Sequence, residues 1–232
     1  MDSIAENLAR VQERIAEAAT RAGRSAEEIE LVAISKTHAA EKVQAAAEAG
    51  QILFGESRVQ EARAKIPLLP LRLRWHFIGH LQKNKIRHAL PLFEFFHGVD
   101  SLALAEDMER IAGEAGLQPR VLLEVNVAGE ASKHGFSPEA LRRDLEAVLL
   151  LGRLTVEGLM TIPPLAPEAE GSRRYFAALR ELRDAFEAEF NLKLPQLSMG
   201  MSGDYPVAIE EGATLVRVGT AIFGDRSRPL LA

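Results

Sequence analysis

The N-terminal segment has the apolar spacing of one helical face. Apolar residues recur every three or four positions, at Ile4, Leu8, Val11 and Ile15. Ser3 and Glu6 stand at capping-box spacing at the start of this run, and Gly23 follows its end. The pattern predicts an amphipathic helix over residues 3–22.

Beyond this helix, short apolar runs alternate with segments of helical spacing. The apolar runs are rich in β-branched residues, which is typical of buried strands. The predicted strands cover residues 30–36, 52–56, 74–79, 93–99, 120–127, 154–161, 196–201 and 214–218. The predicted helices cover residues 39–49, 57–65, 81–90, 101–115, 137–151, 172–190 and 205–211. Ser137 and Pro138 supply an N-cap and a proline at the first helical position.

This order of elements predicts an α/β fold with one extra N-terminal helix. Repeated alternation of strand and helix is typical of a parallel sheet with helical crossovers. Eight such strands are the number that closes a (β/α)8 TIM-type barrel. The alternative is an open, doubly wound sheet, which eight short strands also suit. No linker or low-complexity tract interrupts the chain, so a single domain over residues 1–232 is expected.

Composition excludes several classes of function. The formal net charge is −5, so no general attraction to nucleic acid or to an anionic membrane is expected. The chain has no cysteine, which excludes disulfides and Cys-ligated metals and fits a reducing cytoplasm. Residues 1–24 are charged throughout, so no signal peptide is expected. No metal site is expected, because no spacing of ligand residues around positions 75–85 resembles a zinc site.

Lys36 is the sharpest single candidate for chemistry. It ends an otherwise apolar predicted strand, and in a barrel the functional side chains gather at the C-terminal ends of strands. A lysine with a buried stem has a lowered pKa, which helps its amine to attack a carbonyl. The alternative from position alone is an ordinary surface lysine with its ammonium group in solvent.

The segments after the last two predicted strands are candidates for a phosphate site. Gly219 and Thr220 follow the eighth strand, where backbone N–H groups and a hydroxyl could hold an anion. The stretch from Ser198 to Asp204, with Met201 and Ser202 inside it, follows the seventh strand. These two loops form the usual phosphate site of the barrel fold. The alternative is plain turn chemistry, because Gly and Ser end many strands.

Other polar or polarisable side chains lie at the same strand ends. Arg217 within the last strand is costly unless its donors are used, and the alternative is an outward arginine paired with a helix carboxylate. His76 has the alternative of a satisfied barrel histidine. The remaining candidates at strand ends are Ser57, Asn126 and Met160.

Taken together, the chain resembles the pyridoxal phosphate homeostasis protein family, the small barrels that bind pyridoxal 5′-phosphate (PLP). The resemblance covers nearly the whole chain. It is carried by LVAISKT at 31–37, FGESRVQE at 54–61, HFIGHLQ at 76–82, VNV at 125–127, KHG at 133–135, GLM at 158–160, LSMGMS at 197–202 and RVGTAIFG at 217–224.

The resemblance implies a barrel like the N-terminal domain of alanine racemase, with PLP as an internal aldimine on Lys36. It implies that Ser202, Gly219 and Thr220 hold the phosphate and that Arg217 faces the pyridine nitrogen. A positive guanidinium there disfavours protonation of the ring, and an unprotonated ring is a poorer electron sink. One departure is Ser57-Arg58, where the family usually has Asn-Tyr; Ser57 has capping spacing with Gln60, so it could simply start a helix.

The function expected from this resemblance is intracellular PLP homeostasis without catalysis. A PLP-dependent racemase-like enzyme is the main alternative, but the two tyrosines, Tyr175 and Tyr205, lie outside the matching segments, so a second base is missing. A PLP-free barrel aldolase and an interaction module with a vestigial site are further alternatives. The expected partners are PLP and, transiently, PLP-dependent apo-enzymes. A monomer is expected, because no second domain supplies a dimer interface.

Overall fold

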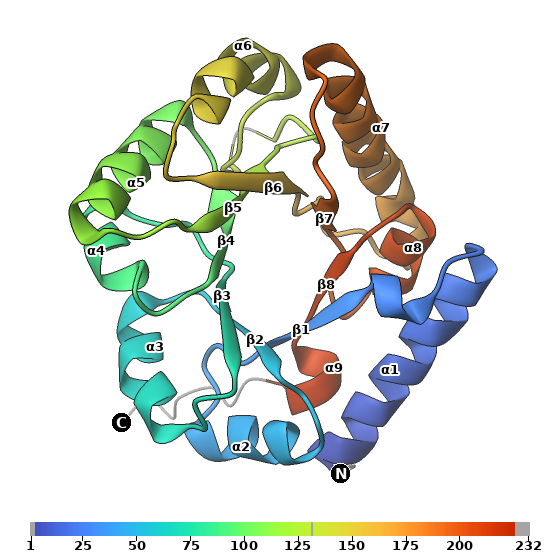
Figure 1. The fold of residues 1–232 in the computed structure, drawn as a ribbon. Coiled ribbons are helices and arrows are strands. Elements are labelled where there is room, and N and C mark those ends of the chain that lie inside the picture. The colour runs from blue at the N-terminus through green and yellow to red at the C-terminus, as the bar shows by residue number, and fades with distance from the viewer. Residues whose placement is uncertain (1–2, 131, 226–232) are drawn as a thin grey trace.

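The computed structural model describes residues 3–130 and 132–225, and its centre is a ring of eight strands (Figure 1). The strands are β1 (Glu30–Ile34), β2 (Leu53–Glu56), β3 (Arg74–Phe77), β4 (Phe95–Val99), β5 (Arg120–Glu124), β6 (Thr155–Met160), β7 (Gln196–Ser198) and β8 (Leu215–Val218). All neighbouring pairs are parallel, and β8 pairs with β1, where Val32 lies opposite Arg217. The predicted closed (β/α)8 barrel is therefore confirmed, and the open sheet is wrong.

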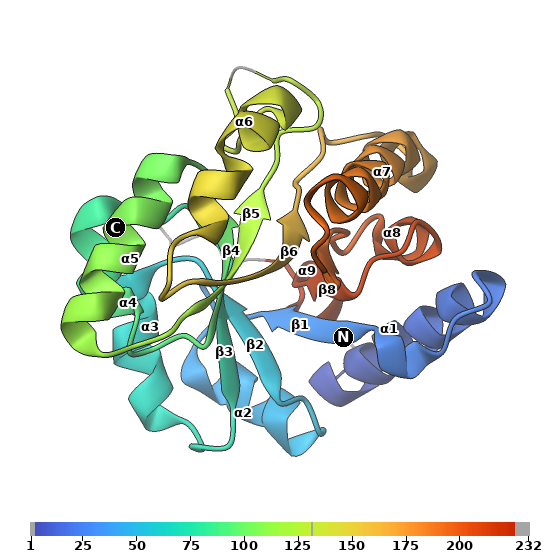
Figure 2. The same ribbon diagram turned by 45° about the horizontal axis from the view of Figure 1, so that its top comes forward.

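Helices surround this ring (Figures 1 and 2). The α-helices are α1 (Ile4–Arg21), α2 (Ala40–Glu48), α3 (Val59–Lys65), α4 (Ile86–Ala89), α5 (Leu102–Ala115), α6 (Pro138–Leu149), α7 (Arg173–Phe190), α8 (Tyr205–Glu210) and α9 (Thr220–Phe223). Short 3₁₀ turns are η1 (Ala26–Glu28), η2 (Ile66–Leu68), η3 (Lys83–Lys85) and η4 (Ala169–Ser172). Within the described ranges, no helix is long and apolar enough to cross a membrane.

The extra N-terminal helix begins as its sequence predicts. The Ser3 side chain accepts from the N–H of Glu6, and the Glu6 carboxylate accepts from the N–H of Ser3. Helix α1 packs against α8 and α9 on the outside of the barrel (Figure 1). Asn7 Nδ2 donates to the carbonyl of Ile222, 3.0 Å away, which ties α1 to the last helix of the described chain. The N-terminal helix thus covers the seam where the barrel closes.

The core has two layers, because each strand buries side chains on both faces. Most buried apolar residues fill the layer between the sheet and the helices. A smaller group fills the barrel interior: Val32, Ile34, Leu53, Phe95, Leu122, Met160 and Leu215. Strand residues alternate in direction, so residues two positions from these also face inward. By that alternation His97, Glu124 and Arg217 lie inside the barrel, and all three are buried.

Several predicted boundaries differ from the structure. The strand predicted over 120–127 ends at Glu124, and the one predicted over 196–201 ends at Ser198. In both places the chain leaves the sheet to form a mouth loop, and hydrophobicity alone does not mark that departure. The helix predicted over 81–90 is η3 followed by the single turn α4. The single domain over 1–232 stays a prediction, since residues 1–2, 131 and 226–232 lie outside the described residues.

Candidate functional site

Lys36 lies at the C-terminal mouth of the barrel, just beyond β1. The strand ends at Ile34, so the strand predicted to run through Lys36 is too long by two residues. Val32 and Ile34 face the interior, and Lys36 is the next residue in that alternation. Its side chain is half-buried, and it has an interaction partner. The role of Lys36 in binding stays a prediction.

The residue before Lys36 is held by a buried charge cluster behind the strands. Lys65 Nζ donates to the Ser35 carbonyl at 2.9 Å and to Glu56 Oε1 at 2.7 Å. Ser35 Oγ donates to the same Glu56 oxygen at 2.7 Å. Burial raises the pKa of Glu56, while the hydrogen bond and charge of Lys65 lower it. We call Ser35, Glu56, Glu61 and Lys65 the Lys65 cluster.

The residue after Lys36 is held by the same cluster in an unusual backbone conformation. Thr37 has a φ of +67°, in the left-handed region that β-branched residues rarely adopt. Its N–H donates to Glu61 Oε1 at 2.6 Å, and that carboxylate also accepts from Lys65 at 2.8 Å. Such strain persists only where the surroundings over-determine it. Lys36 is therefore presented by a backbone that is fixed on both sides.

The loops after β7 and β8 meet beside the end of β1. Ser202 Oγ accepts from the N–H of Gly219 at 3.1 Å and from the N–H of Ala221 at 3.4 Å. Thr220 is the exposed first residue of α9, so the turn predicted at Gly219 is a short helix. A side-chain carbon added at Gly219 would lie 3.3 Å from the Ile34 carbonyl oxygen. The candidate anion donors therefore lie against the end of the strand that leads to Lys36.

Arg217 points into the barrel, not out toward a helix. Its Nη1 donates to Ser198 Oγ at 2.5 Å, and its Nη2 donates to the Thr161 carbonyl at 2.8 Å. Burial lowers the pKa of Arg217 to about 10, while the charges of Glu124 and Asp204 raise it. The guanidinium therefore stays positive near neutral pH. The outward arginine paired with a helix carboxylate is wrong.

Two histidines extend this arrangement through the barrel. His97 Nδ1 lies 2.8 Å from Ser198 Oγ, and His97 Nε2 lies 3.0 Å from His76 Nδ1. His76 Nε2 lies 3.4 Å from Glu94 Oε1 without hydrogen-bond geometry. Burial lowers the pKa of His76 and, much further, that of His97, so both rings are neutral. A neutral ring donates from one nitrogen and accepts at the other, so the row can run unbroken from Arg217 to His76.

Glu124 is a buried carboxylate that sequence reasoning missed. It ends β5, is 9% exposed and lines a small cavity of the mouth. Burial raises its pKa to about 7; the charge of Asp100 raises it too, while Arg217 and His80 lower it. No sequence signal marked it, because a glutamate at a strand end looks like any exposed strand terminus.

The remaining predicted residues are placed less centrally. The Asn126 amide is used within its own loop, where Nδ2 donates to the Glu130 carbonyl at 2.9 Å. Met160 packs inside the barrel, and the Met201 N–H donates to Asp204 Oδ1 at 2.7 Å. Ser57 does not cap α3. That helix begins at Val59, and its N-cap position has no side-chain hydrogen bond.

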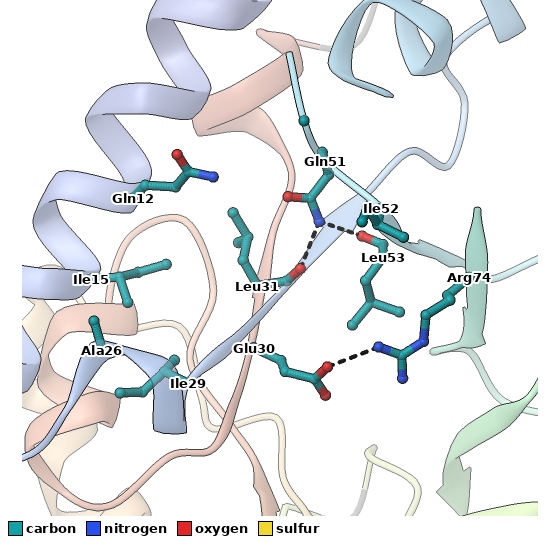
Figure 3. Close-up of a pocket in the computed structure, with 11 residues that line it drawn as sticks. Gln12, Ile15, Ala26, Ile29, Glu30, Leu31, Gln51, Ile52, Leu53 and Arg74 are labelled. Carbon is teal, nitrogen blue, oxygen red and sulfur yellow. Dashed lines mark hydrogen bonds and ion pairs between the residues drawn. The ribbon is translucent and has the colours of Figure 1, made fainter. Parts of the chain in front are cut away.

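A cavity of about 430 Å³ lies at the other, N-terminal end of the barrel (Figure 3). The side chains of Glu30, Gln51 and Arg74, which line it, are paired with one another or with backbone. Arg74 Nη1 donates to Glu30 Oε1 at 3.0 Å, and Gln51 Nε2 donates to the carbonyls of Leu31 and Leu53. No predicted site residue lines this cavity, which is separated from the mouth by the length of the strands.

Comparison with known proteins agrees with this architecture. The chain matches the family described as alanine racemase, N-terminal domain, over residues 2–227. The pyridoxal phosphate homeostasis proteins of Pseudomonas aeruginosa and Aquifex aeolicus are 48% and 46% identical to it. The alignments cover 97% of both chains for the first, and 95% of this chain and 97% of the relative for the second. The chain belongs to the pyridoxal phosphate homeostasis protein family.

Solved structures in this family have the same fold. PipY of Synechococcus elongatus, solved with PLP bound, has a TM-score of 0.85 and 41% identity over 96% of this chain and all of that chain. The form without PLP has a TM-score of 0.87. Alanine racemase of Clostridium difficile has a TM-score of 0.73 but only 17% identity, and this chain covers 58% of it. The racemase likeness therefore shows the barrel fold alone.

Proposed function

We propose that this pyridoxal phosphate homeostasis family member binds PLP at the C-terminal mouth of its barrel, with the aldehyde carbon on Lys36. The supporting observation is that the Ser202, Gly219 and Ala221 anion donors lie against Ile34, two residues before Lys36. PipY, a relative of nearly equal length, has been solved with PLP bound. The residues of this mouth fit the same group.

The phosphate end of PLP suits the β7 and β8 loops. Backbone N–H groups at Gly219 and Ala221 converge on one point, which the Ser202 hydroxyl oxygen occupies. A phosphate oxygen would take that place, and the Ser202 hydroxyl would turn to donate to it. Thr220 adds an exposed hydroxyl at the start of α9. The positive end of a helical turn and a bare glycine favour an anion there.

The aldehyde end of PLP suits Lys36. PLP carries an aldehyde, and the Lys36 amine would hold it through a reversible Schiff base, with release of one water. The Lys65 cluster fixes Ser35 and Thr37 on either side, so the amine is presented at one place. Glu124, Asn126 and Met160 belong to β5, the loop after it and β6, across the barrel from β1.

We infer that Arg217 faces the pyridine nitrogen and restrains the chemistry of the bound cofactor. PLP supplies an electron sink for carbanions, and that sink is strong only when its ring nitrogen is protonated. The buried positive Arg217 opposes such protonation. Ser198 and the Thr161 carbonyl accept from the guanidinium, and His97 contacts Ser198 from behind. This arrangement favours reversible binding, buffering or delivery of PLP over turnover.

A racemase-like enzyme is the second candidate, because the barrel resembles the alanine racemase domain. A two-base mechanism needs an acid or base on each face of the ring. Tyr205 is buried beneath Arg14 of α1, away from the mouth, and the Tyr175 hydroxyl accepts from Arg174. These positions favour the non-catalytic role. Loss of α-deuterium from alanine at enzymatic turnover, with stoichiometric PLP, would instead support the enzyme.

We place this role in the cytoplasm, with a monomer that meets PLP-dependent apo-enzymes only transiently. No nucleic-acid or membrane partner is part of the proposal. Size-exclusion chromatography with light scattering tests the monomer. PLP transfer to a purified apo-enzyme, followed by recovery of its activity, tests delivery.

The binding proposal is tested by absorbance spectra with and without PLP, before and after borohydride. Lys36→Ala should lose the Schiff-base band and should not be labelled covalently by borohydride reduction. Lys83→Ala is the matched control, because Lys83 is exposed on the outer surface. A borohydride-sensitive band that persists in Lys36→Ala, at wild-type intensity, would refute the linkage.

A further inference from the structure

Three side chains of the types that bind metal ions lie close together on the side of the mouth opposite the β7 and β8 loops. His80 follows β3, Asp100 follows β4, and His134 lies in the loop after β5. One ligand atom from each lies within 4.8 Å of the other two. They are separated in sequence, and the pairing of β3 with β4 and of β4 with β5 brings them to the same edge of the sheet. We call this group the His80 cluster.

Both imidazoles point the same nitrogen at one carboxylate oxygen. His80 Nδ1 lies 2.7 Å from Asp100 Oδ2, and His134 Nδ1 lies 3.7 Å from it. The two rings stack with their centroids 4.0 Å apart and their planes 12° from parallel. In a tetrahedral zinc site, ligand atoms about 2.0 Å from the metal lie roughly 3.3 Å from each other. The two distances fall on either side of that value. Because an imidazole nitrogen binds a metal in the plane of its ring, the stacked rings must turn out of their parallel arrangement before both nitrogens face one ion.

The surroundings of the cluster favour a cation. Asp100 is the least exposed of the three, and its other oxygen accepts from Ser101 Oγ at 3.2 Å. That contact orients the carboxylate, as outer hydrogen bonds do for metal ligands. Glu124 adds a second, largely buried carboxylate, which lines the cavity beside the cluster.

Solvent can reach this place. A cavity of about 190 Å³ opens beside the cluster and is lined by Glu124 and His134, among others. His134 and His80 are both partly exposed, so an ion has an entry path. Three protein ligands would leave at least one coordination position open to water or to a small ligand.

We propose that His80 Nδ1, Asp100 Oδ2 and His134 Nδ1 bind one divalent transition-metal ion, of the zinc class, at the mouth of the barrel. Two imidazoles and one carboxylate suit Zn²⁺, Co²⁺ and Ni²⁺ better than Mg²⁺ or Ca²⁺, which prefer oxygen ligands. The ion joins the loops after β3, β4 and β5. This site does not depend on PLP binding.

The experiment is calorimetry of the full chain with Zn²⁺ alone, with no PLP added, supported by Co²⁺ absorption. We expect one ion per chain and visible Co²⁺ bands of a nitrogen and oxygen site. Asp100→Asn and His134→Gln should each weaken Zn²⁺ binding at least about 10-fold. His88→Gln is the matched control, because His88 is exposed on α4, outside the cluster.

The outcomes are distinct. Loss of binding in His134→Gln with an unchanged melting temperature supports the site even if Asp100→Asn folds poorly. The metal site is refuted if the wild type binds less than one Zn²⁺ ion per ten chains, or if His88→Gln loses as much Zn²⁺ affinity as His134→Gln. The contact between His80 and Asp100 would then be a simple hydrogen bond. Lys36→Ala should keep Zn²⁺ binding. The PLP spectra and the Zn²⁺ calorimetry therefore test the two proposals independently.

Discussion

The two ends of the barrel differ in how their polar groups are used. At the N-terminal end, a cavity of about 430 Å³ is lined by Glu30, Gln51 and Arg74, whose side chains pair with one another or with backbone (Figure 3). At the C-terminal mouth the hollows are smaller, and Glu124, which lines one of them, has its pKa raised to about 7 by burial. There Ser202 is the acceptor for two backbone N–H groups that suit an anion.

This difference teaches that cavity size alone does not locate a site. A cavity whose polar groups are already paired has little to offer a charged ligand. Buried polar groups without hydrogen-bond partners reduce the free energy of unfolding, and a ligand that pairs with them can restore it.

The two ends of the barrel also differ in the exposure of their ion pairs. Lys65 and Glu56 are 6% and 0% exposed at the mouth, whereas Arg74 and Glu30 are 39% and 46% exposed.

The largest expected effect is on stability at the mouth. Lys65→Met leaves Glu56 buried without its cation, and breaking one partner of a buried pair costs about 3–5 kcal/mol. We expect a loss of that size in the free energy of unfolding, measured by urea denaturation. Adding Glu56→Gln should restore part of the loss, because no bare charge remains. A loss below about 1 kcal/mol in the single variant would show that the pair is not effectively buried.

The second effect is on affinity at the mouth. Gly219→Val places side-chain carbons against the Ile34 carbonyl, where even a Cβ would be only 3.3 Å away. The anion donors must then move, and we expect PLP affinity to fall about 30- to 100-fold, or roughly 2–3 kcal/mol. Gly113→Val is the control, because nothing lies within 4 Å of a Cβ there. Equal PLP affinities for the two variants would show that the phosphate binds elsewhere.

The third effect is on pH dependence along the row of histidines between the two ends. Burial lowers the pKa of His76 and His97 in the folded state, whereas an unfolded histidine takes up a proton near pH 6.5. The unfolded state binds more protons below that pH, so stability is complete above about pH 6.5 and is lost as the pH falls. Each histidine contributes at most about 1.4 kcal/mol per pH unit.

The measurement is the melting temperature between pH 7.5 and pH 5.5, a range chosen about the pH of roughly 6.5 at which histidine titrates. The wild type should lose stability over this range. The double variant His76→Gln/His97→Gln should lose clearly less, and exposed His88→Gln should behave as wild type. Parallel curves for all three proteins would mean that the buried rings do not control the pH dependence.

The smallest effect is expected at the N-terminal end. Arg74→Met removes partly exposed ion pairs to Glu30 and Glu94, which are each worth up to about 1 kcal/mol. We expect a stability change below about 1 kcal/mol and unchanged PLP affinity by absorbance titration. A several-fold change in affinity would instead show that the two ends are coupled through Glu94 and His76.

Much of the fold could be predicted from local pattern. The capping box at Ser3 and Glu6, the Ser137 N-cap and the eight apolar runs all follow from short-range rules, and all are present in the structure. Strand ends were less predictable, because Val125 and Val127 continue an apolar run although β5 has already ended. Apolar composition marks burial, whereas a strand ends where its ladder partner ends.

The sequence by itself favoured the barrel class and predicted that Lys36 and the loops after β7 and β8 belong to one candidate site. Only the tertiary structure decided that Arg217 points inward, that Lys65 is buried behind Lys36, and that His97 and Glu124 face the barrel interior. It also brought together His80, Asp100 and His134. The physical reason is that a local pattern reports which residues are buried, whereas the partners of a buried charge come from other strands and helices, which meet only in the folded chain.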